Sequence, residues 1–270
     1  MRVQEIDSLE LPELAPYRTM RRQQEHREQG VFVAEGEKVV RRLLESELTV
    51  VSLLLPAKWL REYQALIRAR PEEIQVYVAP KAALEELTGF SMYQGVLGVG
   101  RVPRSPPARA LLEPGPQPRL FAAVAGLSNA QNVGVLVRNC VAFGVQALLV
   151  SGNSASPFLR RAVRSSMGAI FRLPVIENVD LAPTLALLRS NGVRCVAAHP
   201  RSERRTPARA GLASDCCLVF GAEGDGLTPD IIAACDECVA IPMAREVDSL
   251  NVGNAAAVFF YEANRQRGRM

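Results

Sequence analysis

Apolar residues along the chain follow two alternating patterns. Short runs rich in Val, Ile and Leu predict strands, whereas apolar residues three or four positions apart predict helices. In the first hundred residues we expect strands at 31–34, 50–55, 75–79 and 96–99, and helices at 35–46, 57–70 and 81–87. The first of these helices would bury one face, formed by Val39, Val40, Leu43 and Leu44. This part of the chain is predicted to be a small α/β domain.

The second half of the chain alternates more regularly. We expect strands at 120–125, 147–150, 173–176, 195–198, 217–220 and 238–241, and helices at 132–143, 157–166, 183–190, 229–234 and 250–265. Short apolar strands separated by helices are typical of a mostly parallel sheet that is covered on both faces. Ligands of such sheets bind at the carboxyl ends of the strands. Residues that directly follow strands are therefore the first candidates for a functional site.

A proline-rich stretch separates the two halves. Residues 102–119 hold six of the 18 prolines, and proline favours extended backbone and lacks the amide donor that a sheet requires. We therefore expect a domain over 1–101, a linker over 102–119 and a second domain over 120–270.

Composition limits the class of protein. Hydrophobic residues make up 48% of the 270 residues, which is enough for packed cores. No apolar run is long enough to span a membrane. The first residues mix charges and prolines without the apolar core of a secretory signal, so we expect a cytoplasmic location.

The six cysteines all follow residue 130, and only Cys235 and Cys238 have the CxxC spacing of metal and redox motifs. No second pair follows at zinc-finger spacing, and the chain has only two histidines, His26 and His199. We expect buried, reduced thiols rather than a metal site.

Basic residues are almost all arginine. The net charge is +4, and 29 of the 32 basic residues are Arg. A GC-rich genome would produce this bias, but the planar guanidinium is also well suited to phosphate. The arginines cluster at 18, 21, 22 and 27, at 160, 161 and 164, at 201, 204, 205 and 209, and at 265, 267 and 269. Clusters interleaved with acidic stretches favour a positively charged face.

The segment Gly126–Arg138 follows the first strand of the second half. Gly134 allows close backbone approach, and Arg138 lies six residues after Asn132. One interpretation is an Asn cap and a surface Arg. We favour a functional Arg138, because it follows Val135-Leu136-Val137 in a helix that is predicted to be largely buried, where an unpaired charge would be costly.

Three further segments carry polar or glycine-rich signals. Phe220–Leu227 contains three glycines around Glu223, but it matches neither the Walker A motif nor the dinucleotide fingerprint. Ser249-Leu-Asn251 opens an apolar helix, where Asp248 or Ser249 would serve as N-cap or the helix start would face a ligand. In 165–174, Gly168 is consistent with a plain helix stop.

Together these segments resemble the SpoU (TrmH) family of SPOUT methyltransferases. The resemblance rests on Asn132-x-Gly134-x-x-x-Arg138, on Gly221-Ala-Glu223-Gly-x-Gly-Leu227, and on Ile241-Pro-Met243 followed by Ser249-Leu-Asn251-Val252. Residues 166–174 also resemble the family, and 27–40 resemble the amino-terminal substrate-binding domain of its ribosomal-RNA branch. One departure is Asn129-Ala130, where many relatives carry Asp-Pro, and this puts the ordering of RNA by that loop in doubt.

The resemblance implies transfer of a methyl group from S-adenosylmethionine to a ribose 2′-hydroxyl of structured RNA. It also implies a carboxyl-terminal trefoil knot and a homodimer whose active site is completed across the interface. The implied cofactor residues are Gly221, Ile241, Met243 and Leu250, and the implied catalytic residues are Arg138, Asn132, Glu223, Ser249 and Asn251. RNA affinity would come from the first domain and from phosphate contacts of Arg21, Arg22, Arg27, Arg160, Arg161 and Arg164. No metal is expected, because the sulfonium is already a reactive methyl donor.

Other functions stay open at this point. Two separate domains favour a large folded target, which we interpret as ribosomal RNA. A tRNA ribose methyltransferase and a ribosome-modifying resistance enzyme are the alternatives within the class. A non-catalytic RNA-binding or ribosome-assembly factor is disfavoured by the intact motif residues, and a nicotinamide oxidoreductase by the order of the glycines.

Overall fold

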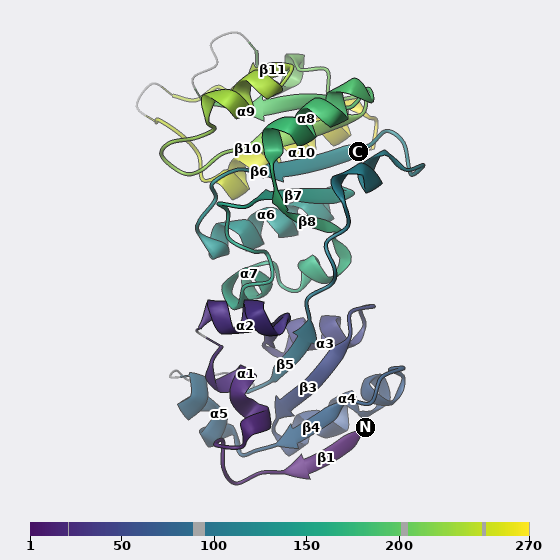
Figure 1. The fold of residues 1–270 in the computed structure, drawn as a ribbon, viewed down its shortest axis with the longest axis vertical. Helices are drawn as coiled ribbons and strands as arrows, with labels where there is room; N and C mark the ends of the chain where they lie inside the picture. The colour runs from purple at the N-terminus through teal and green to yellow at the C-terminus, as the bar shows by residue number, and fades with distance from the viewer. Residues whose placement is uncertain (21, 89–94, 201–204, 245–246, 270) are drawn as a thin grey trace. The chain divides into compact units, whose positions relative to one another are not determined.

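The computed structural model describes residues 1–20, 22–88, 95–200, 205–244 and 247–269. The chain forms two compact units, each with its own sheet (Figure 1). The first unit comprises Met1–Arg104 and Phe158–Phe171, and the second comprises Ser105–Pro157 and Arg172–Met270. The segment Phe158–Phe171 thus packs with the first unit, although it lies within the 120–270 range that the sequence assigns to the second domain.

The first unit contains a five-stranded sheet in the order β1-β4-β3-β5-β2. β5 runs antiparallel to β3 and β2, and the other pairs are parallel. Its strands are β1 (Arg2–Glu5), β2 (Val31–Glu35), β3 (Val50–Leu55), β4 (Gln75–Val78) and β5 (Leu97–Arg101), and its first five helices are α1 (Ala15–Arg18), α2 (Gln23–Gln29), α3 (Glu37–Leu44), α4 (Ala57–Arg68) and α5 (Lys81–Thr88). The predicted α/β domain is confirmed, and α3 buries the four apolar residues expected of it.

The second unit contains a six-stranded sheet in the order β11-β9-β10-β6-β7-β8. All of its strand pairs are parallel. The strands are β6 (Leu120–Val124), β7 (Ala147–Ser151), β8 (Val175–Val179), β9 (Arg194–Ala198), β10 (Cys216–Phe220) and β11 (Glu237–Val239), and the helices are α6 (Ala130–Ala142), α8 (Leu181–Ser190), α9 (Pro229–Ala234) and α10 (Val252–Gln266). The predicted mixed α/β class with a parallel carboxyl-terminal sheet is therefore confirmed.

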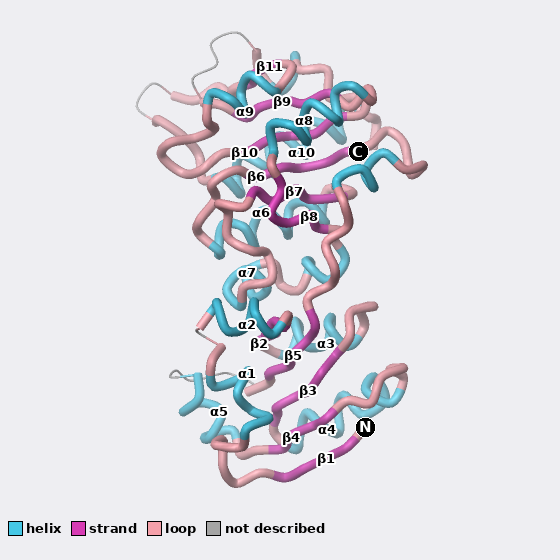
Figure 2. The backbone as a smooth tube through the Cα atoms, viewed as in Figure 1, coloured by secondary structure: helices cyan, strands magenta, loops and turns pink. Residues whose placement is uncertain are grey.

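Helices cover both faces of this second sheet, as Figure 2 shows. On one face, α8 and α9 pack over β6, β7 and β10 in a single apolar cluster. On the other face, the Phe220 ring of β10 contacts the rings of Phe259 and Phe260 on α10, and α10 also packs against α6. Because both faces are covered, the central strands β6, β7 and β10 are buried at every position.

Most of the proline-rich stretch belongs to the second unit. From Ser105 onward the chain is part of that unit, and Leu111, in a short 3₁₀ turn (Ala108–Leu112), is buried in its apolar cluster. The amide of Arg119 donates to the Asp215 carboxylate over 2.7 Å. The linker expected over 102–119 rests on its six prolines, and the structure buries Leu111 within this stretch.

The six cysteines are free thiols; five are buried and Cys238 is half-buried. Burial raises the pKa of Cys216 to about 11, so this thiol is protonated at neutral pH. In the described parts of the chain, no group of three His, Cys, Asp or Glu side chains is placed to hold a metal ion. Among the same residues, no helix has the length and apolar character needed to cross a bilayer.

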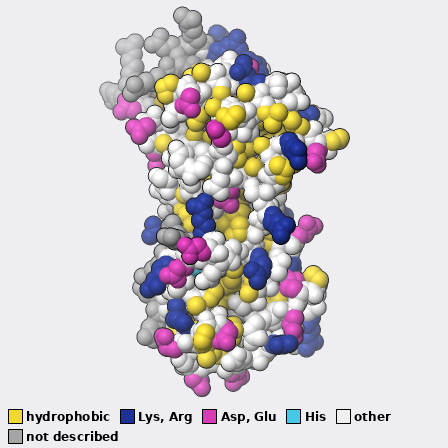
Figure 3. Space-filling view, in the orientation of Figure 1, with side chains coloured by type: hydrophobic (Ala, Val, Ile, Leu, Met, Phe, Trp, Pro, Cys, Tyr) yellow, Lys and Arg dark blue, Asp and Glu magenta, His cyan; other side chains and the backbone are white. Residues whose placement is uncertain are grey.

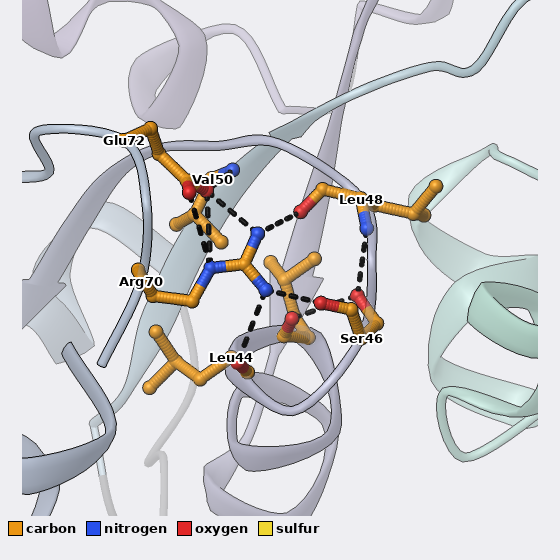
Figure 4. Close-up of polar contacts among 7 residues, drawn as sticks. Leu44, Ser46, Leu48, Val50, Arg70 and Glu72 are labelled. Atoms are coloured by element: carbon orange, nitrogen blue, oxygen red, sulfur yellow. Dashed lines mark hydrogen bonds and ion pairs between the residues drawn. The ribbon is translucent and has the colours of Figure 1, made fainter.

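A buried arginine closes the turn between α3 and β3 (Figure 4). The Arg70 side chain is only 9% exposed, and its guanidinium donates to the carbonyls of Leu44, Ser46 and Leu48. It also pairs with the Glu72 carboxylate at 2.7 Å, and that carboxylate accepts from the Val50 amide. Burial raises the pKa of Glu72, but Arg70 and the Val50 amide outweigh it, so the net pKa lies below the ordinary value. The Arg70 side chain thus donates hydrogen bonds to three backbone carbonyls of the turn between α3 and β3.

The helices α6 and α10 approach closely at Gly253. A Cβ at this position would lie 2.5 Å from Cγ1 of Val135, far inside normal contact distance. Asn139 donates to the carbonyl of Gly253 over 2.6 Å, and Asn264 donates to the carbonyl of Phe143 over 2.9 Å. Side-chain amides therefore join the carboxyl-terminal end of α6 to both ends of α10, whose contact with α6 requires glycine.

Replacing Arg70 by Ala should lower the free energy of unfolding by about 3 kcal/mol, because Glu72 and three carbonyls lose their partner. Chemical denaturation followed by circular dichroism measures this change. The exposed Arg68, two residues earlier on α4, provides a matched Arg68→Ala control that should leave stability within about 0.5 kcal/mol of the original. Equal losses in both variants would contradict the buried network.

Gly253→Ala should destabilise the second unit by about 1–3 kcal/mol through overpacking against Val135. The double variant Gly253→Ala/Val135→Ala removes the clashing methyl groups and should recover part of the loss. Thermal unfolding of the two variants and of Val135→Ala alone measures the coupling. Strictly additive effects would show that the two residues do not press on one another.

Candidate active site

Three polar segments meet at one edge of the second sheet. The loop after β6 leads into α6, the loop after β10 contains Glu223, and the segment after β11 leads into α10. Because all six strands are parallel, their carboxyl ends lie at the same edge, and β6 and β10 are direct neighbours in the sheet. The topology therefore brings together residues that are far apart in the sequence.

Three of the predicted catalytic residues form one hydrogen-bonded group. Asn132 donates from Nδ2 to Oε1 of Glu223 over 2.6 Å, and Asn251 donates to the same oxygen over 3.0 Å. Asn251 Nδ2 also lies 3.2 Å from Oδ1 of Asn132. Glu223 and Asn251 are exposed and Asn132 is half-buried, so the group faces solvent. One carboxylate oxygen thus orients two amides at a surface that a substrate can reach.

The helix starts hold these side chains in place. Asn251 is the N-cap of α10, because its Oδ1 accepts from the Gly253 amide over 2.9 Å. The interpretation of Asp248 or Ser249 as the cap is therefore wrong, and α10 begins at Val252. At the start of α6, Asn129 is the cap and accepts from the Gln131 amide over 2.9 Å. Asn129 thus supplies the capping oxygen of α6.

A pocket opens beside this group at the ends of β9, β10 and β11. It is lined by all four residues that the sequence predicts for the cofactor, Gly221, Ile241, Met243 and Leu250, and by Glu223 and Ser249. Gly221 has a steric reason to be glycine, because a Cβ there would lie 2.3 Å from the carbonyl carbon of Gly226. Ala222 and Gly226 exchange backbone hydrogen bonds of 3.1 Å, which close the loop tightly.

Sequence reasoning missed several residues of the pocket wall. Ala198, His199, Phe220, Val239, Val252, Ala255 and Phe259 also line it. His199 directly follows β9, so the rule that ligands bind at strand ends would have found it. The apolar members from α10 carry no such signal, because a residue that lines a pocket and a residue of the core look alike in a hydrophobic pattern.

Arg138 lies apart from the hydrogen-bonded group. Successive helix residues turn by about 100°, so the side chains of Asn132 and Arg138 leave α6 about 120° apart. Arg138 is exposed and makes no hydrogen bond or ion pair with any residue that the structure describes. The expectation of buried surroundings for Arg138 is therefore wrong. Ser249 is also exposed, and it borders the pocket.

The residues predicted to bind RNA differ in their surroundings. Arg160 and Arg164, on α7 (Arg160–Ser165), pair with the buried carboxylate of Glu35 at 2.6 and 3.0 Å. Arg160 is only 14% exposed, so its guanidinium is used inside the first unit rather than presented to a phosphate. Arg161 and Arg27 are exposed, Arg22 is exposed and pairs with Glu25, and Arg21 lies outside the described residues.

Several clustered arginines have structural partners; Arg201 and Arg204 of the third cluster lie outside the described residues. Arg267 donates to the carbonyls of Leu212, Arg119 and Ser214, and Arg265 pairs with Glu262. On the face in Figure 3, basic and acidic side chains are interspersed. Clustering of arginine in the sequence is therefore a weak guide to a binding surface in this chain.

Comparison with known proteins identifies the family. Residues 119–261 match the SpoU rRNA Methylase family, and residues 15–98 match the MRM3-like substrate binding domain. An uncharacterized tRNA/rRNA methyltransferase of Mycobacterium tuberculosis is 34% identical over 240 residues, which are 87% of this chain and 81% of that protein.

Solved structures agree over nearly the whole chain. An RNA 2′-O ribose methyltransferase superposes with a TM-score of 0.78 at 27% identity, covering 98% of this chain and 99% of that chain. An AdoMet-bound rRNA methyltransferase from Sinorhizobium meliloti gives a TM-score of 0.82 at 24% identity, covering 97% and 98%. The fold is that of the SPOUT methyltransferases. The chain belongs to the SpoU rRNA methylase family, whose members are RNA methyltransferases that use S-adenosylmethionine.

Proposed function

We propose that this protein transfers the methyl group of S-adenosylmethionine to a ribose 2′-hydroxyl in ribosomal RNA. The observation that carries the proposal is the Asn132–Glu223–Asn251 group at the rim of the pocket. Oriented amides and a carboxylate can hold a ribose by its hydroxyls, and the neighbouring pocket can hold the methyl donor. The MRM3-like domain supports an RNA substrate.

The pocket residues suit S-adenosylmethionine. Ile241, Leu250 and Val239 provide apolar walls for an adenine ring, and the loop around Gly221 exposes backbone donors and acceptors to the polar parts of the ligand. Glu223 adds a carboxylate beside them, which favours a cationic ligand. The cofactor supplies an activated methyl group.

The task of the protein residues is then alignment and charge stabilisation. Holding the 2′-oxygen in line with the methyl group removes most of the entropic part of the barrier. Asn132 and Asn251, fixed by Glu223, would orient the ribose, and Ser249 would add a hydroxyl at the pocket rim. We assign Arg138 to polarising the 2′-hydroxyl and binding its neighbouring phosphate, because an ordinary guanidinium stays protonated and cannot accept a proton.

The separation of Arg138 from the amide group favours a site that is completed by a second copy of the chain. On α10, Val258 is 40% exposed and Tyr261 is 50% exposed, and large apolar side chains at the surface are common at protein interfaces. We therefore propose that the protein is a homodimer. We also propose that it acts in the cytoplasm. We propose further that the carboxyl-terminal part of the chain forms the trefoil knot of the SPOUT methyltransferases.

Ribosomal RNA is our preferred substrate because a separate domain precedes the catalytic one. A transfer RNA or an antibiotic-resistance site on the ribosome would use the same chemistry. The exposed Arg22, Arg27 and Arg161 are described residues that we propose for phosphate contacts, and RNA binding should weaken steeply with salt.

Arg138→Ala should reduce methyl transfer by roughly 100-fold or more, because the negative charge that develops on the 2′-oxygen loses the guanidinium that stabilises it. Binding of S-adenosylmethionine, measured by calorimetry, should stay unchanged, since Arg138 does not line the pocket. The exposed Arg109 in the same unit gives the control Arg109→Ala, which should keep full activity. Turnover of Arg138→Ala near that of the unaltered protein would refute the assignment.

Primer extension at limiting nucleotide concentration distinguishes the RNA targets. Ribosomal RNA from cells that lack this protein should lose one ribose-methylation stop, and adding the purified protein should restore it. Loss of a stop in a transfer RNA, with ribosomal RNA unchanged, would move the substrate assignment to tRNA.

A further inference from the structure

The segment Phe158–Phe171 is built into the core of the first unit, although it lies between two strands of the second sheet in the sequence. The ring of Phe32 on β2 lies 5.6 Å from the ring of Phe158 and 5.4 Å from that of Phe171, measured between centroids. All three rings are buried. Aromatic packing thus holds both ends of the segment.

Charges hold the middle of the segment. The Glu35 side chain is 4% exposed, and its two carboxylate oxygens accept from Arg160 and Arg164 separately. Arg42 donates to the carbonyl of Met167. Gly168 has a φ of +76°, and a Cβ there would lie 3.0 Å from the Phe171 ring and 3.3 Å from the Cβ of Arg42 on α3. The Gly168 turn therefore fits the segment to the first unit and is more than a helix stop.

Residues 153–155, directly before this segment, form hydrogen bonds with the loop that leads to Asn132. The Gly126 amide donates to Oδ1 of Asn153 over 3.0 Å, and the Leu127 amide donates to Oγ of Ser154 over 3.1 Å. In the opposite direction, the Ala155 amide donates to the carbonyl of Leu127 over 2.9 Å. These bonds fix residues 126 and 127, and Asn129 two residues later caps the helix that carries Asn132.

Only Ser156 and Pro157 separate residues 153–155 from the segment in the first unit. The proline ring fixes one of the two backbone torsions of its residue, so this connection contains few free torsions. A change in the segment Phe158–Phe171 would therefore reach the loop 126–129 through very few rotatable bonds.

We infer that Glu35 and Ser154 are positioning residues for methyl transfer. In this inference, which rests on the proposed function, Glu35 fixes the segment Phe158–Phe171, Ser154 fixes the loop before α6, and together they set Asn132 when the first unit holds RNA. Neither residue contacts the cofactor or the reacting ribose. The chain thereby couples RNA capture by one unit to alignment of the catalytic amide in the other.

The test compares Glu35→Gln, Ser154→Ala and Ser154→Thr with the unaltered protein. Glu73→Gln is the matched control, because Glu73 is in the same unit and pairs with Arg2 at an exposed site. Each protein is mixed with unmodified, transcribed ribosomal RNA and S-adenosylmethionine, both at saturating concentration, and the single-turnover rate is measured. Calorimetry and filter binding give the affinities for cofactor and RNA.

Glu35→Gln and Ser154→Ala should each lower the single-turnover rate roughly tenfold, with both affinities within about twofold of the original. Ser154→Thr keeps the hydroxyl and should restore the rate, and Glu73→Gln should match the unaltered protein. The double variant Glu35→Gln/Ser154→Ala should lose little more than either single variant, since both act through the same loop.

Full rates at saturation, losses confined to RNA affinity, or multiplied losses in the double variant would each overturn the inference. Absence of methyl transfer by the unaltered protein would instead contradict the proposed function. The two failures are therefore distinguishable in one set of reactions.

Discussion

The candidate site depends on one carboxylate oxygen. Oε1 of Glu223 accepts from Asn132 and from Asn251, residues that are 91 and 28 positions away in the sequence. Asn132 stands at the start of α6 and Asn251 caps α10, so this oxygen joins two helix starts to the glycine loop after β10. If Glu223 were lost, Asn132 would keep only the 3.2 Å hydrogen bond from Asn251, and Asn251 would keep its cap bond to the Gly253 amide. The pocket would retain its apolar walls but lose the oxygen that orients both amides.

The parallel sheet makes this meeting possible. Strand ends that lie side by side bring several loops to one edge of the sheet. In the loop after β10, only glycine at 221 leaves room for the backbone of Gly226. The close contact at Gly253 then brings α10 against α6, so that both amides reach the same carboxylate. Packing of the loop and of the two helices thus determines where Asn132, Glu223 and Asn251 lie relative to one another.

Much of this arrangement could be predicted from the sequence. The alternation of strands and helices indicates the parallel sheet, and the three motif segments identify the amide group and four pocket residues. The strand β1 could not be found in this way, because every one of its residues is exposed and it carries no apolar pattern. The surroundings of Arg138 were also mispredicted, because three preceding apolar residues do not show which way the next side chain points.

Long-range partners account for the other differences. Nothing near Arg160 in the sequence indicates Glu35, 125 positions away, which turns an apparent phosphate ligand into part of a core. Arg70 and Arg267 likewise satisfy backbone carbonyls of distant turns. A high arginine content therefore does not show which guanidinium groups face solvent; only the tertiary structure does.

The central claim is the chemistry at the Asn132–Glu223–Asn251 group, and the modified nucleoside tests it most directly. Unmodified ribosomal RNA is incubated with the protein and with S-adenosylmethionine labelled in its methyl group, then digested to nucleosides and analysed by mass spectrometry. We expect label in one 2′-O-methylnucleoside, and none when Asn132 is replaced by Ala. Label in a methylated base, or no label from a protein that binds the cofactor, would contradict it.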